Sequence, residues 1–343
     1  MPEVRSRRGI RAEADPLSDA VLDPKGGYGN RGSLGAGVAI GLCTALIWAG
    51  YIVVLREGMQ SGYRPIDMAA ARYWPAGLIL LPVLLRAGIR DLGGVGWLRG
   101  AVLTVFAGPP FALILSSGLA LTPVSHGGVI APATMTLMTT LLTVIFLKER
   151  LSTARGLGIF LIASGLLLIA GLAFLTTFNT DVLIGDLLVV AAPSLWAVFT
   201  VLLRVWQIDA VRGTAAVSVL GGLVILPIHL AVSDYGALVA QHGWADIGLQ
   251  FLAQGGMNGF LATLLFLVTV SRIGPARAAV FPSLVPALSL LIGAPLLGEQ
   301  PDAIQMGGLV LATLGLFLAV GLYDEWRAGR LRRVEAAASR KSV

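Results

Sequence analysis

Charged residues and cysteine are both scarce in this sequence of 343 residues. Only 13% of the residues are charged, about half the share of an average soluble domain, whereas 56% are hydrophobic. A soluble protein of this length would need more polar side chains to cover its surface, so the composition excludes an ordinary soluble fold. The single cysteine, Cys43, excludes an intrachain disulfide and a cysteine-based metal site.

Catalytic and metal-binding patterns are also missing. The three histidines, His126, His229 and His242, are too far apart in the sequence to indicate a metal cluster. The sequence has no Asp-rich pair, histidine cluster or nucleophile–base pair of the kind that an integral membrane enzyme would need. We therefore predict no enzymatic activity, no catalytic residue, no metal and no cofactor.

The basic character of the chain comes from its tails and loops. The net charge of +6 and the pI of about 9.9 could indicate a nucleic-acid partner. A nucleic-acid-binding protein, however, gathers Lys and Arg on one face among aromatic residues, and here they lie almost wholly in the tails and in short breaks between apolar runs. We predict a lipid bilayer and a small-molecule substrate as partners, and no nucleic acid; the sequence leaves the oligomeric state open.

Ten apolar runs are long enough for membrane-spanning helices, each of which needs about 20 residues so that the helix satisfies its own backbone groups in lipid. Gly108, Pro109 and Pro110 interrupt the third run. The sequence thus predicts an all-α membrane protein with ten transmembrane helices, near residues 34–55, 66–86, 98–119, 124–147, 156–175, 183–203, 213–232, 246–270, 275–297 and 303–323.

The distribution of basic residues predicts the direction of these spans. If the N-terminus is cytoplasmic, all but three of the 25 Lys and Arg residues lie on the inner side; Arg56 and Arg64 lie outside and Arg72 lies within a span. Residues 1–33 have no apolar signal-peptide core and are predicted to form a disordered cytoplasmic tail. Residues 326–343 are predicted to form a basic cytoplasmic tail. We expect a multi-pass protein of the inner (plasma) membrane with both termini in the cytoplasm.

The sequence also repeats itself. A shift of 150 residues aligns Pro132 with Pro282, Glu149 with Glu299, and three glycines with three others; a shift of 148 aligns Trp48 with Trp196. The first repeat spans residues 34–175 and the second spans 183–323, with five predicted helices in each. Because five is odd, the second repeat must enter the membrane from the opposite side, and inverted-topology repeats of this kind are typical of secondary transporters. The alternative is a non-transport membrane scaffold enlarged by duplication.

Small residues recur on two of the spans. Gly37 and Gly41 lie four residues apart on the first span, and Gly158, Gly165 and Gly171 recur along the fifth. Small residues let helix backbones approach closely in a membrane. We expect these glycines to serve tight helix packing within each half.

Several segments together resemble one family. They are ALIWAGYIVVLR in the first span, AARYWPAGLILLP in the second, LTPVSHGGVIAPATMTLMTTLLTVIFLKERLSTARGLGIFLIASGLLLIA across the fourth and fifth, and GDLLVVAAPSLWAVFTVLLR and IGPARAAVFPSLVPALSLLIGAPLLGEQ in the second half. The sequence is similar to the drug/metabolite transporter superfamily, of the ten-helix EamA type. The resemblance implies a five-plus-five inverted-repeat bundle and an inner-membrane permease, often an exporter of metabolites or amino acids, without implying a substrate. Gln300 and Pro301 depart from the family pattern, in which a basic and an apolar residue are common.

Arg72 is the first candidate site residue, because a charged side chain within a span is costly and therefore suggests a function. Its guanidinium could pair with a substrate carboxylate or phosphate, and Tyr73 and Trp74 follow it. The alternative is a side chain that extends to the outer interface or bonds a helix end.

Two further spans contribute polar candidates. Gln250, Gln254 and Asn258 follow at i, i+4 and i+8 on the eighth span, so an α-helix would place them on one face that either lines a wet path or bonds a neighbouring helix. Thr136 on the fourth span is a weaker candidate, because threonine often bonds the carbonyl four residues before it in its own helix.

Trp48 and Trp196, which the repeat makes equivalent, are candidates for paired cavity walls or for packing residues. His126 could gate the pathway or sense protons, or it could simply be a capped histidine at a helix end. Pro132, Pro282 and Pro286 interrupt the fourth and ninth spans at matching depth, which in transporters points to the substrate site. The first span has Cys43, Thr44 and Trp48 where related proton-coupled multidrug exporters have a buried glutamate, which disfavours that coupling chemistry.

The sequence therefore predicts a secondary transporter, a permease, exporter or facilitator, that moves a small polar metabolite such as an amino acid by alternating access. The alternatives are a lipid-linked sugar flippase, a multidrug exporter or, in another class, the membrane scaffold.

Overall fold

The computed structural model describes residues 34–148, 152–166, 168, 179–273, 278, 280–298 and 301–319. Throughout these ranges the chain is built of helices joined by short connections, and none of these residues is in a β-strand. The predicted tails, 1–33 and 326–343, lie outside the described residues, as do Glu149, Glu299 and Gly171.

The helices follow one another in two sets. The first half contains α2 (Leu34–Ser61), α3 (Pro65–Ala87), the short 3₁₀ helix η1 (Ile89–Gly94), α4 (Trp97–Ala107), α5 (Pro109–Leu121), α6 (Val124–Leu147) and α7 (Thr153–Leu166). The second half contains α9 (Thr180–Val205), α10 (Ala210–Val232), α11 (Tyr235–Phe251), the π-helix η3 (Leu252–Ala262), α12 (Thr263–Ile273), α14 (Val280–Leu297) and α15 (Ala303–Ala319).

Seven helical segments in the described part of the chain are long and apolar enough to cross a membrane. One of them joins α4 and α5 across the break at Gly108, where the sequence predicts an interruption; another runs from α11 through η3 into α12. Three shorter apolar helices, Thr153–Gly165, Leu284–Leu297 and Ala303–Ala319, fall at the fifth, ninth and tenth predicted spans. The all-helical membrane architecture is confirmed, whereas the count of ten spans stays a prediction.

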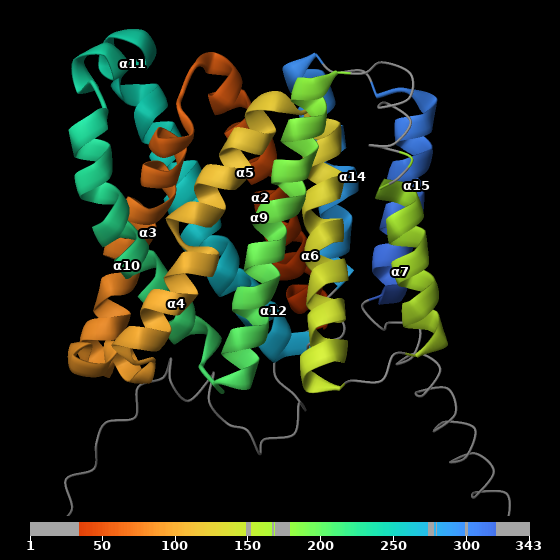
Figure 1. The fold of residues 1–343 in the computed structure, drawn as a ribbon, viewed down its shortest axis with the longest axis horizontal. Coiled ribbons are helices and arrows are strands. Elements are labelled where there is room, and N and C mark those ends of the chain that lie inside the picture. The colour runs from red at the N-terminus through yellow and green to blue at the C-terminus, as the bar shows by residue number, and fades with distance from the viewer. Residues whose placement is uncertain are drawn as a thin grey trace, which may run out of the picture.

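The two halves run in opposite directions through the bundle. The α2–α3 and α10–α11 connections lie together at the top of Figure 1, which we call the upper end. Helix α2 therefore starts at the lower end, whereas α9 starts at the upper end (Figure 1). The lower end holds the helix ends that carry Arg86, Arg204 and Arg212, which the charge distribution assigns to the inner side.

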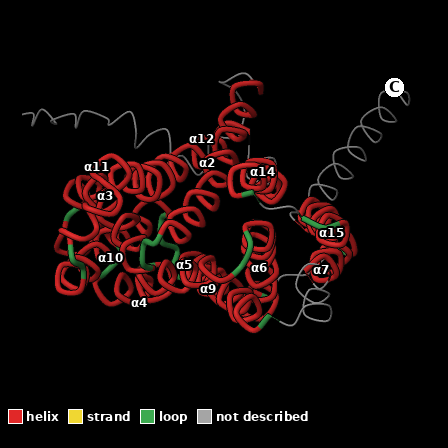
Figure 2. The backbone as a smooth tube through the Cα atoms, turned by 90° about the horizontal axis from the view of Figure 1, so that it is seen from above, coloured by secondary structure: helices red, strands yellow, loops and turns green. Residues whose placement is uncertain are grey.

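Close glycine packing joins the two halves, and our expectation that it acts within each half is wrong. Helices α7 and α15, one from each half, lie side by side at the edge of the bundle (Figure 2). A Cβ atom on Gly165 would lie 2.6 Å from the Gly308 carbonyl oxygen, and one on Gly315 would lie 2.6 Å from that of Gly158. Similarly, Gly37 and Gly41 of α2 face α12 and α14. Only glycine allows backbones to approach this closely.

Candidate functional site

A cavity of about 180 Å³ lies between the two halves. Its walls come from α2, α3, α5 and α6 of the first half and from α9, η3 and α14 of the second. Most of the wall is aromatic or aliphatic; Arg72 is its charged side chain, Asn258 brings an amide and Tyr51 a hydroxyl. The lining residues are Trp48, Tyr51, Ile52, Arg72, Phe111, Leu115, Leu119, Gly127, Ala131, Pro132, Met135, Pro193, Trp196, Asn258, Pro282 and Val285.

Arg72 is surrounded by aromatic rings. Its guanidinium carbon lies 5.3 Å from the ring centre of Tyr51, 5.4 Å from Phe111, 5.7 Å from Trp196 and 5.8 Å from Tyr73. All four distances are within the range of cation–π attraction, which is worth about 2 kcal/mol or more for a desolvated cation. These rings come from α2, α3, α5 and α9, so the fold gathers them from both halves.

No carboxylate neutralises this cation within the described part of the chain. Arg72 is buried, with 9% of its surface exposed. Its Nη1 atom has no hydrogen-bond partner, and none of the ion pairs among the described residues includes it. A buried guanidinium without an anion is costly in a membrane protein, and pairing with an anionic group would lower that cost.

Small residues bring η3 against α3 next to Arg72. A Cβ atom on Gly255 would lie 2.8 Å from the Ala71 carbonyl oxygen and 2.9 Å from that of Arg72. Such a close approach is open only to glycine at this position. The approach positions Asn258, one turn further along η3, at the cavity wall, and π-helical turns are frequent at functional sites.

The three polar residues predicted on one face of the eighth span divide between two environments. Asn258 lines the cavity. Gln250 instead donates from Nε2 to a Glu57 carboxylate oxygen on α2 at 3.4 Å, and Gln254 donates to the Gln250 side-chain oxygen at 3.3 Å. Gln254 is buried and does not line this cavity; besides Gln250 in the same segment, its Nε2 lies 3.9 Å from Sδ of Met68 on α3, and its role in substrate binding stays a prediction.

The repeat-related residues meet at the cavity, as the sequence pattern suggests. Trp48 and Trp196 both form part of its wall, and so do Pro132 and Pro282. Trp48 lies 5.2 Å from the ring of Phe266, and Trp196 lies 5.0 Å from Phe111.

Tyr73 and Thr136 do not line this cavity. The Tyr73 hydroxyl lies 2.7 Å and 2.8 Å from the carbonyl oxygens of Ala107 and Gly108, at the break between α4 and α5. The Thr136 hydroxyl donates to the Pro132 carbonyl oxygen at 3.0 Å, within its own helix. Both hydroxyls are thus engaged with backbone carbonyl oxygens.

Sequence reasoning missed Tyr51 and Phe111. Tyr51 lies three residues after Trp48 and therefore on the same face of α2, which was the available signal. Phe111 follows the Gly-Pro-Pro break, and its contact with Arg72 depends on a fold that places α5 beside α3.

Comparison with known proteins identifies the architecture. The model of the EamA-like transporter family matches residues 35–171 and 183–321, one match for each half. An uncharacterized transporter of Archaeoglobus fulgidus is 24% identical over 278 residues, covering 80% of this chain and 94% of that protein. The uncharacterized transporter YyaM of Bacillus subtilis is 26% identical over 270 residues, covering 76% and 86%.

A solved crystal structure shares the fold. It superposes with a TM-score of 0.56 at 18% sequence identity, covering 84% of this chain and 97% of that one. Because the family model matches both halves over most of their length, this multi-pass membrane chain belongs to the EamA-like transporter family.

Proposed function

We propose that this transporter carries small organic anions, carboxylate-bearing metabolites such as amino acids among them, by alternating access of the cavity between its halves. The observation that carries the proposal is Arg72, a buried guanidinium without a partner anion at the wall of a cavity between the halves. A bound carboxylate would supply the missing negative charge and accept two parallel N–H bonds from the guanidinium fork.

The remaining wall supports a substrate with an apolar or aromatic body. Trp48, Phe111 and Trp196 offer ring faces, and the Asn258 amide and the Tyr51 hydroxyl offer polar groups besides Arg72. Ligand sites commonly combine such apolar walls with a few polar groups that fix orientation. An amino acid or acid with an apolar side chain fits this pattern better than a highly hydroxylated compound.

The size and charge of the cavity weigh against the alternatives. About 180 Å³ is small beside the roughly 300–1,000 Å³ of sites that hold drug-sized ligands, which disfavours multidrug export and a lipid-linked sugar. Its described lining includes Arg72 and no Asp or Glu, which favours anions over the cationic drugs. A scaffold would have no need for an unpaired buried cation between its halves.

The test is uptake and binding in proteoliposomes. Labelled amino acids and simple carboxylates are compared with amides and amines of the same shape. We expect carboxylates to bind, and Arg72→Gln to weaken binding about 10- to 150-fold, the loss of one hydrogen bond to a charged group. Arg72→Lys keeps the charge but loses the planar fork, so it should restore binding only in part.

Arg99 provides the matched control. It too has an aromatic neighbour, Trp206 at 5.7 Å, but it does not line the cavity. Arg99→Gln should leave binding unchanged. If amides and amines bind as well as carboxylates, or if folded Arg72→Gln binds normally, the anion proposal is wrong.

A further inference from the structure

All three histidines of the chain lie near the upper end, each beside an aspartate. His229 Nε2 lies 2.9 Å from an Asp67 oxygen, His126 Nδ1 lies 3.1 Å from an Asp186 oxygen, and His242 Nδ1 lies 3.6 Å from an Asp246 oxygen. The first two contacts join the first half to the second. The third lies within α11.

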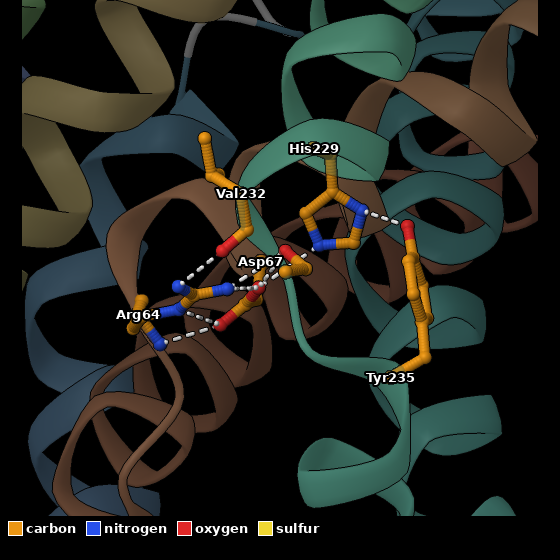
Figure 3. Close-up of polar contacts among 6 residues, drawn as sticks. Arg64, Asp67, His229, Val232 and Tyr235 are labelled. Atoms are coloured by element: carbon orange, nitrogen blue, oxygen red, sulfur yellow. Dashed lines mark hydrogen bonds and ion pairs between the residues drawn. The ribbon is translucent and has the colours of Figure 1, made fainter.

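The Asp67–His229 pair sits in a network between α3 and α10 (Figure 3). Asp67 also accepts hydrogen bonds from the Arg64 backbone at 2.9 Å and from the Ser233 hydroxyl at 3.2 Å. The Tyr235 hydroxyl lies 2.8 Å from Nδ1 of His229, and Arg64 Nη1 donates to the Val232 carbonyl oxygen at 3.0 Å. Both members of the pair are almost fully buried, with side chains 3% and 4% exposed.

The His126–Asp186 pair lies between α6 and α9. The Thr122 hydroxyl donates to Asp186, and Nε2 of His126 lies 3.1 Å from the side-chain nitrogen of Gln305 on α15. His126 and Asp186 have side chains 1% and 8% exposed. One histidine therefore links three helices, of which two belong to the second half.

The upper end has more contacts between the halves. The Tyr63 hydroxyl donates to Asp246 at 2.9 Å; burial and the nearby carboxylate raise the pKa of Tyr63, so the phenol keeps its proton. At the lower end, the described residues offer Arg212, which donates to the Gly93 carbonyl oxygen at 3.3 Å, and Arg99 over Trp206. Within the part of the chain that the structure describes, buried carboxylates join the halves only at the upper end.

We infer that Asp67–His229 and His126–Asp186 form a gate that closes the upper end and breaks when the halves separate there. This inference rests on the proposed alternating access. Both pairs flank the cavity: Gly127, which follows His126, lines it, and Asp67 lies five residues before Arg72 on α3. On opening, water can replace each partner, so neither the imidazoles nor the carboxylates are left without hydrogen bonds. A contact of this kind can break and form again without the cost of an unsatisfied buried group.

The test measures access to the cavity and needs no substrate. In a Cys43→Ser background, Leu119→Cys places a thiol at the cavity wall, where Leu119 is 1% exposed. A membrane-impermeant maleimide is added to sealed vesicles of both orientations, and a separate Thr180→Cys protein, whose reporter residue is exposed on α9, shows which orientation presents the upper end. From that side, His229→Ala and His126→Ala should each raise the labelling rate at position 119 about 5- to 150-fold.

Three further sets of variants distinguish a gate from a general effect on folding. Asn179→Ala removes the α9 cap, a polar contact at the same end within one half, and should leave the rate unchanged. His→Gln at positions 126 and 229 keeps a donor and should label almost as slowly as the parent. If Asp67→Ala is added to His229→Ala, the further increase should be less than additive, because the contact to His229 is already lost and, between the halves, only the one from Ser233 remains to be removed.

Gel filtration identifies the folded variants, and labelling is compared among them. Unchanged labelling in folded His126→Ala and His229→Ala, or an equal rise in Asn179→Ala, would overturn the gate. If carboxylates fail to bind, the proposed substrate class is wrong but the gate is not. The labelling experiment measures access to the cavity and needs no substrate.

Discussion

Arg72 and Tyr73 are neighbours on α3, yet their polar groups have different surroundings. The guanidinium of Arg72 is held by ring faces and keeps Nη1 without a partner among the described residues. The hydroxyl of Tyr73 has partners, the carbonyl oxygens of Ala107 and Gly108. Ring faces attract a cation without neutralising its charge. The hydroxyl, in contrast, stabilises the break between α4 and α5.

We therefore predict that Tyr73→Phe acts on stability and leaves substrate binding intact. The change removes the donor to two buried carbonyl oxygens and keeps the ring beside Arg72. The free energy of unfolding should fall by about 1 kcal/mol. Thermal unfolding of the detergent-solubilised protein and carboxylate binding are measured on the same sample. Weaker binding with unchanged unfolding would return Tyr73 to the substrate path.

The π-helix η3 explains why the polar residues of α11 and η3 have different surroundings. An α-helix of 3.6 residues per turn would keep Gln250, Gln254 and Asn258 near one face. From Leu252 the chain is π-helical, so the residues after that point turn by a smaller angle per step. Gln250 reaches Glu57, while Asn258 reaches the cavity.

Alanine substitutions should separate these two roles. Asn258→Ala is expected to weaken carboxylate binding about 5- to 150-fold with little effect on unfolding, because Asn258 lines the cavity. Gln250→Ala removes a buried contact to α2 and should lower the unfolding free energy by about 1–3 kcal/mol with near-normal affinity in the folded protein. Binding isotherms and melting curves of both variants provide the test. The reverse pattern would place the substrate beside α11.

The close approach of η3 to α3 should also be needed for substrate binding. Gly255→Ala places a Cβ atom 2.7 Å from Pro75 Cγ and 2.8 Å from the Ala71 carbonyl oxygen, so η3 must move away from α3. A Cβ on Gly256 would meet only Leu252 Cδ1, at 3.3 Å, one turn earlier in the same segment. We expect at least about tenfold weaker binding in Gly255→Ala, because misplacing a binding group by 1 Å is costly. Gly256→Ala should bind normally; equal losses in the two variants would refute this account.

For the whole molecule, the sequence repeats predict two similar halves and their order along the chain. They do not predict which helices touch across the halves, because an offset between aligned residues carries no information on contact. Gly158 and Gly165 repeat along one helix and so suggest packing, but only the fold shows that their partner is α15. The aromatic residues around Arg72 are far apart in sequence, and Tyr51 and Phe111 in an apolar span resemble ordinary packing residues.

Cross-half glycine packing can be tested directly. Gly165→Val adds a branched side chain where even a Cβ would lie 2.6 Å from the Gly308 carbonyl oxygen, so α7 and α15 must separate. We expect the free energy of unfolding to fall by about 1–3 kcal/mol or more, which is the usual cost of overpacking a well-packed interior. Gly156→Val on the same helix has no neighbouring atom within 4 Å of its Cβ and serves as the control. Similar melting temperatures for the two variants would contradict this packing.

We predict that the lower end of the bundle faces the cytoplasm. The lower end carries the helix ends with Arg86, Arg204 and Arg212, and basic residues favour the cytoplasmic side. A reporter active only in the cytoplasm should therefore work when inserted in the α9–α10 connection, at residues 206–209, and fail in the α10–α11 connection, at residues 233–234. Fusion after residue 343 should also be active, because two sets of five spans return the chain to the side where it began. If the α9–α10 connection is cytoplasmic but a fusion at residue 343 is active only outside the cell, the even span count is wrong. An outside α9–α10 connection would instead reverse the whole bundle and place the gate at the cytoplasmic face.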